Sequence, residues 1–283
     1  MLKKYSLPIH LSFDGLESAH AAYLERGDGT PLLMLHGFMG DAGCWLPLMD
    51  QLSNAKGAAL QAHHYHCIGL DLLGFGDSTK PMIQYTVAKE VEFVRRAVEA
   101  LQLESFYLLG HSFGGWVASA YAVRHPEMVK GLILAAPAGI RDDSFAGRYD
   151  HLRPLLWQTP LIDWALHVVT PIARAFGQEK PLAQIAWFRQ QLNAQPAARS
   201  FLVDRLRPED AIDTVEKDIH RIAVPTLVIT GDQDDTIPLW HSQTYAQRIP
   251  QAELVILPGA SHALPQNHAP ELASLIRQRV VIG

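Results

Sequence analysis

Short runs of consecutive apolar residues recur along the chain, and each run ends near a glycine, a proline or an aspartate. They cover residues 32–35, 67–70, 106–109, 132–136, 224–229 and 253–257. Strands without a polar face are typical of parallel sheets that are covered by helices on both sides. The runs therefore predict the buried parallel strands of a central sheet.

Between these runs lie segments in which apolar residues recur at helical spacing. In residues 87–101, for example, Val91, Val94, Val98 and Leu101 follow one another at three- and four-residue steps. Alternation of strands with amphipathic helices predicts an α/β fold with a mostly parallel central sheet and helices on both faces. Two earlier segments, 9–13 and 19–25, predict an antiparallel hairpin ahead of the parallel strands.

The regular alternation stops between residues 138 and 222. Helix-compatible patches rich in tryptophan and leucine occur there, broken by Pro154, Pro160, Pro171, Pro181, Pro196 and Pro208. A structureless loop of this length is rare inside a compact domain. We therefore expect a helical cap inserted at 138–222, with short helices separated by the prolines. Residues 1–137 and 223–283 then form the core domain.

Composition narrows the classes of partner. The 283 residues carry a net charge of −5 with scattered basic residues, which argues against a nucleic-acid partner. No apolar run approaches the roughly 18 residues that cross a bilayer, so no membrane partner is predicted. The first residues do not resemble a signal peptide, and Cys44 and Cys67 are interpreted as free thiols in a reducing compartment. These features predict a cytoplasmic protein and leave its oligomeric state open.

One short motif carries candidate chemistry. Gly110-His111-Ser112-Phe113-Gly114 lies between an apolar run and a helix-like segment. A serine on a tight strand-to-helix turn has a strained backbone and needs small neighbours, and the following helix directs its positive end toward the hydroxyl. Ser112 is therefore the candidate nucleophile. The alternative is a glycine-rich turn with a capping serine.

Together with His36-Gly37-Phe38 and the segment Asp-Leu-Leu-Gly-Phe-Gly-Asp-Ser at 71–78, this motif resembles the α/β-hydrolase superfamily, specifically its capped members. The similarity covers residues 32–136 and 224 to the end. It implies the α/β-hydrolase fold and serine hydrolase chemistry on a small-molecule substrate. That chemistry requires no cofactor.

The resemblance also implies an acid and a base, because members of this fold carry the nucleophile, the acid and the histidine in that order. The family spacing after the run 224–229 selects Asp234 as the acid, with Asp232 and Asp235 as alternatives. His262 follows the next strand and matches the base. The later His268 is interpreted as a surface or capping residue.

Acyl transfer develops negative charge on a substrate oxygen, which preorganised backbone N–H groups stabilise. The resemblance assigns this oxyanion hole to the amides of Phe113 and Phe38, with Met39 as the next candidate. His36 is expected to hydrogen-bond the loop.

Other conspicuous residues are given structural interpretations first. Asp71 is expected to fix its loop through backbone hydrogen bonds, and residues 63–66, His-His-Tyr-His, are interpreted as a solvated strand entrance, so no metal site is predicted. Trp157, Trp164 and Trp187 in the cap either pack helices together or line an apolar substrate pocket.

These features predict a carboxylesterase-like serine hydrolase that cleaves an ester-type bond of a small, mainly apolar substrate through an acyl-enzyme. Haloalkane dehalogenases and epoxide hydrolases resemble the chain but place an aspartate where Ser112 stands. Carbon–carbon bond hydrolases of ring-cleavage products share the serine and the cap, and remain an alternative. A ligand receptor on the same fold, with little turnover, is a second alternative.

Overall fold

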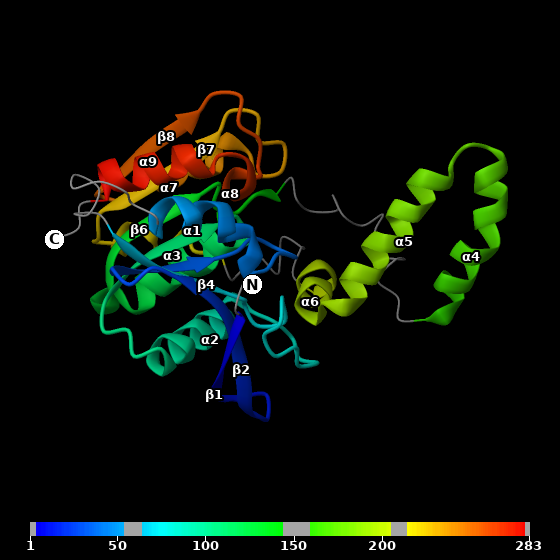
Figure 1. Ribbon diagram of the computed structural model, residues 1–283, viewed down its shortest axis with the longest axis horizontal. Coiled ribbons are helices and arrows are strands. Elements are labelled where there is room, and N and C mark those ends of the chain that lie inside the picture. Colours follow the sequence, from blue (N-terminus) through cyan, green and yellow to red (C-terminus); the bar gives the residue numbers. More distant parts are fainter. Residues whose placement is uncertain (1–3, 54–63, 144–158, 205–213, 281–283) are drawn as a thin grey trace.

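The computed structural model describes residues 4–53, 64–143, 159–204 and 214–280, and a single eight-stranded sheet organises them (Figure 1). Its spatial order is β1-β2-β4-β3-β5-β6-β7-β8. The strands are β1 (Lys4–Phe13), β2 (Leu16–Arg26), β3 (Thr30–Leu35), β4 (Tyr65–Leu70), β5 (Phe106–His111), β6 (Val129–Ala135), β7 (Thr226–Gly231) and β8 (Ala252–Leu257).

Every neighbouring pair from β4 to β8 is parallel, whereas β1 and β2 form an antiparallel hairpin that joins the sheet through an antiparallel β2–β4 pair. Both features confirm the predicted α/β fold and its leading hairpin. Strand β8 is only half-buried, because it lies at the edge of the sheet and has a neighbour on one side. The expectation of two apolar faces therefore holds less well there than for the inner strands.

Helices cover both faces of the sheet (Figure 1). On one face α2 (Val87–Ala100) and α3 (Phe113–Arg124) contribute to one apolar cluster, together with Tyr245 of α7 (Leu239–Arg248). On the other face α1 (Leu46–Ser53), α8 (Leu264–Asn267) and α9 (Ala269–Arg279) contribute to a second cluster. Three short 3₁₀ helices, η1 (Ala42–Trp45), η3 (Pro126–Met128) and η7 (Ile219–Arg221), lie in the connections of the described part.

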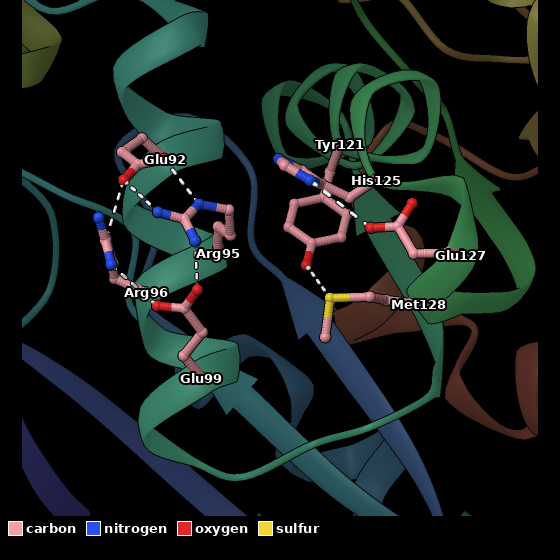
Figure 2. Close-up of polar contacts among 8 residues, drawn as sticks. All are labelled: Glu92, Arg95, Arg96, Glu99, Tyr121, His125, Glu127 and Met128. Carbon is pink, nitrogen blue, oxygen red and sulfur yellow. Dashed lines mark hydrogen bonds and ion pairs between the residues drawn. The ribbon is translucent and has the colours of Figure 1, made fainter.

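Helix α2 shows why its sequence forms an amphipathic helix. The Thr86 hydroxyl caps its start by accepting a hydrogen bond from the amide of Lys89 at 3.1 Å. Its outer face carries a network in which Glu92 and Glu99 pair with Arg95 and Arg96, each pair three or four residues apart, about one helical turn (Figure 2). Such exposed pairs each add only about 0.2–0.5 kcal/mol, so the helix depends mainly on its buried valines.

In the described part of the segment expected to form a cap, between β6 and β7, lie three α-helices: α4 (Pro160–Ala175), α5 (Glu179–Ala194) and α6 (Pro196–Asp204). Helix α6 packs on the core, where Ala197, Ala198 and Phe201 are buried. The Ser200 hydroxyl there accepts a hydrogen bond from the Tyr85 amide at 3.0 Å. Helices α4 and α5 form a hairpin that projects away from the sheet (Figure 1).

The prolines of this segment only partly separate helices. Pro160 and Pro196 begin α4 and α6, where the missing N–H costs nothing. Pro171, however, lies inside α4, which continues to Ala175. The expectation of a break there was wrong, because a proline near the end of a helix removes one backbone hydrogen bond and leaves the earlier turns intact. Pro154 and Pro208 lie outside the described residues.

The two cysteines, Cys44 and Cys67, are both free. Burial raises the pKa of the Cys67 thiol to about 12, which keeps it protonated and unreactive at neutral pH. Among the helices in the described ranges, none has the length and apolar character needed to cross a bilayer.

Candidate active site

Ser112 lies on the sharp turn that joins β5 to α3. Its backbone has φ of 53° and ψ of −117°, a strained conformation for a residue with a side chain. A Cβ on Gly110 would lie 2.3 Å from the Gly114 carbonyl oxygen, and one on Gly114 would lie 2.2 Å from that of Leu35. The turn therefore requires both glycines, as the motif indicated.

Three side chains predicted from the sequence meet at this turn. His262 Nε2 lies 3.0 Å from Ser112 Oγ, and His262 Nδ1 lies 2.8 Å from Asp234 Oδ2. Asp234 follows β7 and His262 follows β8, so the three residues come from the carboxyl ends of parallel strands at one edge of the sheet. Ligand sites of open parallel sheets lie at this edge.

The surroundings of Asp234 favour its charged form. Burial by itself raises the pKa of a carboxyl group, but hydrogen bonds from His262 and from the amides of Ile237 and Thr236 outweigh it and lower the Asp234 pKa below its ordinary value. The two amides donate to Oδ1 at 2.8 and 2.9 Å, while Oδ2 faces His262. An ionised Asp234 requires the proton on His262 Nδ1, which leaves Nε2 able to accept the Ser112 proton.

The sequence alternatives for acid and base have other partners. Asp232 accepts a hydrogen bond from the Gly259 amide at 2.7 Å, and Asp235 lies beside the Thr236 hydroxyl. His268 precedes α9 and pairs with Glu271 at 3.5 Å. Each of these groups stabilises a local loop or helix end.

The loop after β3 lies directly against the nucleophile. A Cβ placed on Gly37 would be 3.3 Å from the Ser112 Cβ, so only a glycine allows the loop to approach this closely. His36 holds the loop, because its Nε2 accepts from the Leu72 amide at 3.0 Å and its Nδ1 donates to the Gly37 carbonyl at 2.7 Å. Burial lowers the His36 pKa, which keeps the ring neutral for both bonds.

The residues assigned to the oxyanion hole lie side by side. Phe38 and Phe113 have ring centroids 5.9 Å apart, and Phe113 is the first residue of α3. Amides in the first turn of a helix have no intrahelical acceptor, so they are available to a ligand oxygen. The backbone of Phe113 is therefore suited to bind a developing oxyanion.

Sequence reasoning did not identify His111 as part of the site. Its Nε2 lies 2.8 Å from the His262 carbonyl oxygen, and because a carbonyl only accepts, Nε2 must carry the proton. Burial and the neighbouring His262 lower the His111 pKa to about 3, so its ring stays neutral at physiological pH. His111 thus fixes the backbone of the histidine that touches Ser112.

Four phenylalanine rings pack against one another next to the turn that carries Ser112. Phe113 contacts Phe201 of α6 with centroids 4.9 Å apart, and it contacts Phe75 at 5.9 Å. Phe38 contacts Phe75 at 5.7 Å and Phe201 at 6.4 Å. We call these four residues the aromatic cluster. Phe75 was read as a loop residue, and Phe201 had no sequence signal because its role depends on where α6 docks.

The tryptophans proposed for a pocket behave differently. Trp164 on α4 is 65% exposed and Trp187 on α5 is 60% exposed, so neither is enclosed in the arrangement described. Trp157 lies outside the described residues. The pocket assignment of these residues stays a prediction.

The remaining polar motifs have local structural partners. Asp71 accepts hydrogen bonds from the Ala42 and Asp77 amides at 2.6 and 2.7 Å and pairs with Lys4 at 2.7 Å, which fixes its loop as expected. His64 pairs with Asp28 and His66 with Glu25, and His63 lies outside the described residues. Within the described residues, no group of three potential metal ligands gathers.

Comparison with known proteins identifies the family. The alpha/beta hydrolase fold family model matches residues 30–268. A 2-hydroxymuconate semialdehyde hydrolase of Pseudomonas putida is 31% identical over 260 residues, covering 89% of this chain and 87% of that protein. Lipase 3 of Moraxella sp. (strain TA144) is 28% identical over 245 residues, covering 83% of this chain and 72% of the lipase.

The solved structures agree at the level of the fold. A thermophilic esterase from Thermogutta terrifontis superposes with a TM-score of 0.72 at 22% identity, over 98% of each chain. Since the family match spans most of the sequence and the P. putida relative covers nearly all of it, this chain belongs to the α/β-hydrolase fold family and is a hydrolase.

Proposed function

We propose that this protein is a serine hydrolase that cleaves an ester-type bond of a small, mainly apolar substrate through an acyl-enzyme. The observation that carries the proposal is that one imidazole, His262, lies within hydrogen-bond distance of both Ser112 Oγ and Asp234 Oδ2. A nucleophile, a base and an orienting carboxylate in this arrangement are the requirements of acyl transfer.

In the proposed reaction Ser112 Oγ attacks the ester carbonyl carbon while His262 Nε2 takes the hydroxyl proton. The carbonyl oxygen becomes an oxyanion held by the amides of Phe38 and Phe113. Its collapse breaks the bond to the alcohol, which leaves with the proton from His262. Water, deprotonated by His262, then attacks the acyl-enzyme, and the acid is released as Ser112 regains its proton.

The aromatic cluster favours a neutral, apolar acyl group. Phe38, Phe75, Phe113 and Phe201 present phenyl rings around the nucleophile, and such rings stabilise apolar groups by excluding water. An acyl chain or a small aromatic acid fits these surroundings.

One observation favours a second candidate, hydrolysis of a carbon–carbon bond in a ring-cleavage product. The P. putida relative at 31% identity is named for the hydrolysis of 2-hydroxymuconate semialdehyde. The same serine and histidine would serve both reactions, but the dienoate substrates of such enzymes carry a carboxylate, which phenyl rings do not pair.

Activity-based labelling tests the proposal. A fluorophosphonate should modify Ser112, and the purified protein should hydrolyse p-nitrophenyl butyrate, with Ser112→Ala lowering kcat roughly ten-thousandfold. Ser119→Ala is the matched control, because Ser119 lies on α3, which follows Ser112, and its hydroxyl bonds the Gly115 carbonyl and the Tyr245 hydroxyl, neither of which is assigned to the site. Full activity in Ser112→Ala would refute the proposal. Decay of a yellow dienol substrate without ester hydrolysis would favour the second candidate.

A further inference from the structure

Helices α4 and α5 expose an unusual amount of apolar surface. The exposed large apolar residues of α4 are Leu161, Trp164, Val168, Val169 and Ile172, and Phe176 follows directly after the helix. Ile185 and Trp187 of α5 add to them. Isolated exposed apolar residues are ordinary, but a gathering of this size marks an interaction surface. We call the hairpin of α4 and α5 the arm.

Four exposed apolar residues of α4 share one face. Leu161, Trp164, Val168 and Ile172 follow one another at three- and four-residue steps, so they form a continuous stripe. A different face, which includes the half-buried Ile162 and Leu166, is turned away from this stripe. The α4 helix is thus apolar on both faces, although no residue of it is fully buried. A helix of this kind needs a second apolar partner.

The polar groups of the arm are largely neutralised by one another. Arg189 is buried and pairs with Asp163 at 2.7 Å, and it also donates to the Thr159 carbonyl, which fixes the start of α4 to α5. Arg174 pairs with Glu179 at 2.6 Å across the turn between the helices. Paired charges approach a low-dielectric phase at lower cost than isolated ones.

We propose that the arm docks on the surface of a phospholipid bilayer, with the α4 stripe inserted among the lipid headgroups. The side chains fit this partner, because tryptophan and phenylalanine concentrate at membrane–water interfaces. With 16 residues, α4 is about 24 Å long, shorter than the roughly 30 Å hydrocarbon core, so it would lie in the interface rather than span it. This revises the expectation of no membrane partner, which considered only spanning segments.

Charge also distinguishes the arm from the rest of the molecule. Residues 160–194 contain three basic side chains (Arg174, Lys180 and Arg189) and two acidic ones (Asp163 and Glu179), although acidic residues exceed basic ones by five in the whole chain. Phosphate-bearing headgroups therefore attract the arm and repel the acidic body, which orients the arm toward the lipid.

The arm leads directly to the candidate site. Helix α5 continues into α6 after Gln195, and Phe201 of α6 belongs to the aromatic cluster around Ser112. An acyl chain that leaves the bilayer along α5 would pass Ile185 and Trp187 before it reaches Phe201 and the aromatic cluster. This delivery of lipid-borne esters rests on the proposed function, whereas docking does not.

Vesicle flotation with the full chain tests docking without catalysis. The Ser112→Ala protein should float with vesicles of three parts phosphatidylcholine and one part phosphatidylglycerol. Trp164→Glu and Phe176→Glu, made in the same background, should each lower the partition coefficient between vesicles and water at least about tenfold. Each replaces an aromatic ring that docking would bury among the lipids by a charge. Both side chains are mainly exposed, 65% and 77%, so the variants should fold.

Ile256→Glu is the matched control. Ile256 is 40% exposed on the edge strand β8, away from the arm, and a charge is well tolerated on an edge strand. This variant should float like the parent. Failure of the parent to float, or equal flotation of the arm variants and the parent, would overturn the proposal. A dimer in sedimentation that Phe176→Glu dissociates, without flotation, would also overturn it and assign the stripe to a second copy of the chain.

An activity measurement separates docking from the proposed function. With the intact Ser112, hydrolysis of a long-chain ester in vesicles should fall at least about tenfold in Phe176→Glu, while hydrolysis of dissolved p-nitrophenyl butyrate should stay unchanged. Flotation without any ester hydrolysis would overturn the proposed function and leave docking in place.

Discussion

Replacing Asp234 by asparagine changes one atom and tests the geometry of the site. The Asp234 carboxylate accepts from two backbone amides with Oδ1 and faces His262 Nδ1 with Oδ2. An asparagine carbonyl has to occupy the Oδ1 position, because an amide group turned the other way would place N–H donors against the two backbone donors. The asparagine NH₂ therefore points at His262.

The consequence is a change of tautomer. Since the NH₂ group only donates, His262 Nδ1 must accept, and the ring proton moves to Nε2, where it faces Ser112 Oγ at 3.0 Å. The imidazole can then no longer take the serine proton. Turning the amide back would sacrifice two hydrogen bonds, about 1 kcal/mol each, and bring donors together. We expect kcat to fall roughly ten-thousandfold, equivalent to about 5.5 kcal/mol of barrier.

The assay compares kcat for p-nitrophenyl butyrate and the rate of fluorophosphonate labelling in three variants. Asp234→Asn should lose both, whereas Asp232→Asn and Asp235→Asn should keep activity within about threefold, because Asp232 bonds the Gly259 amide and Asp235 lies beside the Thr236 hydroxyl, whereas Asp234 faces His262. If Asp234→Asn retained activity within tenfold, or if Asp232→Asn caused the larger loss, the assignment of the acid would be wrong.

Three further changes test other parts of the structure. Burial raises the pKa of Glu90 well above its ordinary value, so the protonated Glu90 stabilises the fold fully below about pH 4.3, and this stability is lost as the pH rises through the folded pKa. Glu90→Gln should therefore flatten the decline of Tm as the pH rises above about 4.3, and an unchanged slope would contradict this. His36→Leu removes the acceptor of a buried amide and should cost about 1–3 kcal/mol in urea denaturation, whereas a stability equal to the parent would refute that role. Gly114→Ala forces a Cβ to 2.2 Å from a carbonyl oxygen and should destabilise by about 3 kcal/mol or more, and a normal Tm would refute the tight turn.

The fold was predictable because the inner strands of a parallel sheet are apolar on both faces. All six predicted runs correspond to strands β3 to β8, and the helix expected at 87–101 is α2 within one residue. The tight turn at Ser112 was also predictable, since Gly110 reports a backbone constraint that acts within four residues, against the Gly114 carbonyl, although Gly114 itself meets the distant Leu35 carbonyl. Local constraints of this kind leave a signature in the sequence.

The contributions of His111 and Phe201 were not predictable, because each depends on tertiary placement. His111 reaches the carbonyl of a residue 151 positions away, and nothing in its neighbours indicates that contact. Phe201 enters the aromatic cluster only because α6 docks on the core through residues such as Ala197. In the cap, Pro171 gave a misleading signal, since one missing hydrogen bond was outweighed by the rest of α4.

The two parts of the inserted segment, α6 and the arm, are stabilised in different ways. The single prediction of short helices separated by prolines therefore did not describe both. Helix α6 buries its apolar residues against the core, and its Phe201 contacts Phe113, the residue after Ser112. The position of α6 therefore affects the surroundings of Ser112. In the arm, Asp163 pairs with Arg189 and Arg174 pairs with Glu179, while the apolar stripe of α4 is exposed. An apolar element joined to α6 is suited to bring an insoluble ester to Ser112, the nucleophile we propose. Mutations on the arm should therefore lower hydrolysis of esters in vesicles and leave hydrolysis of dissolved esters unchanged. Mutations around α6 should change the rate of hydrolysis for both forms of substrate.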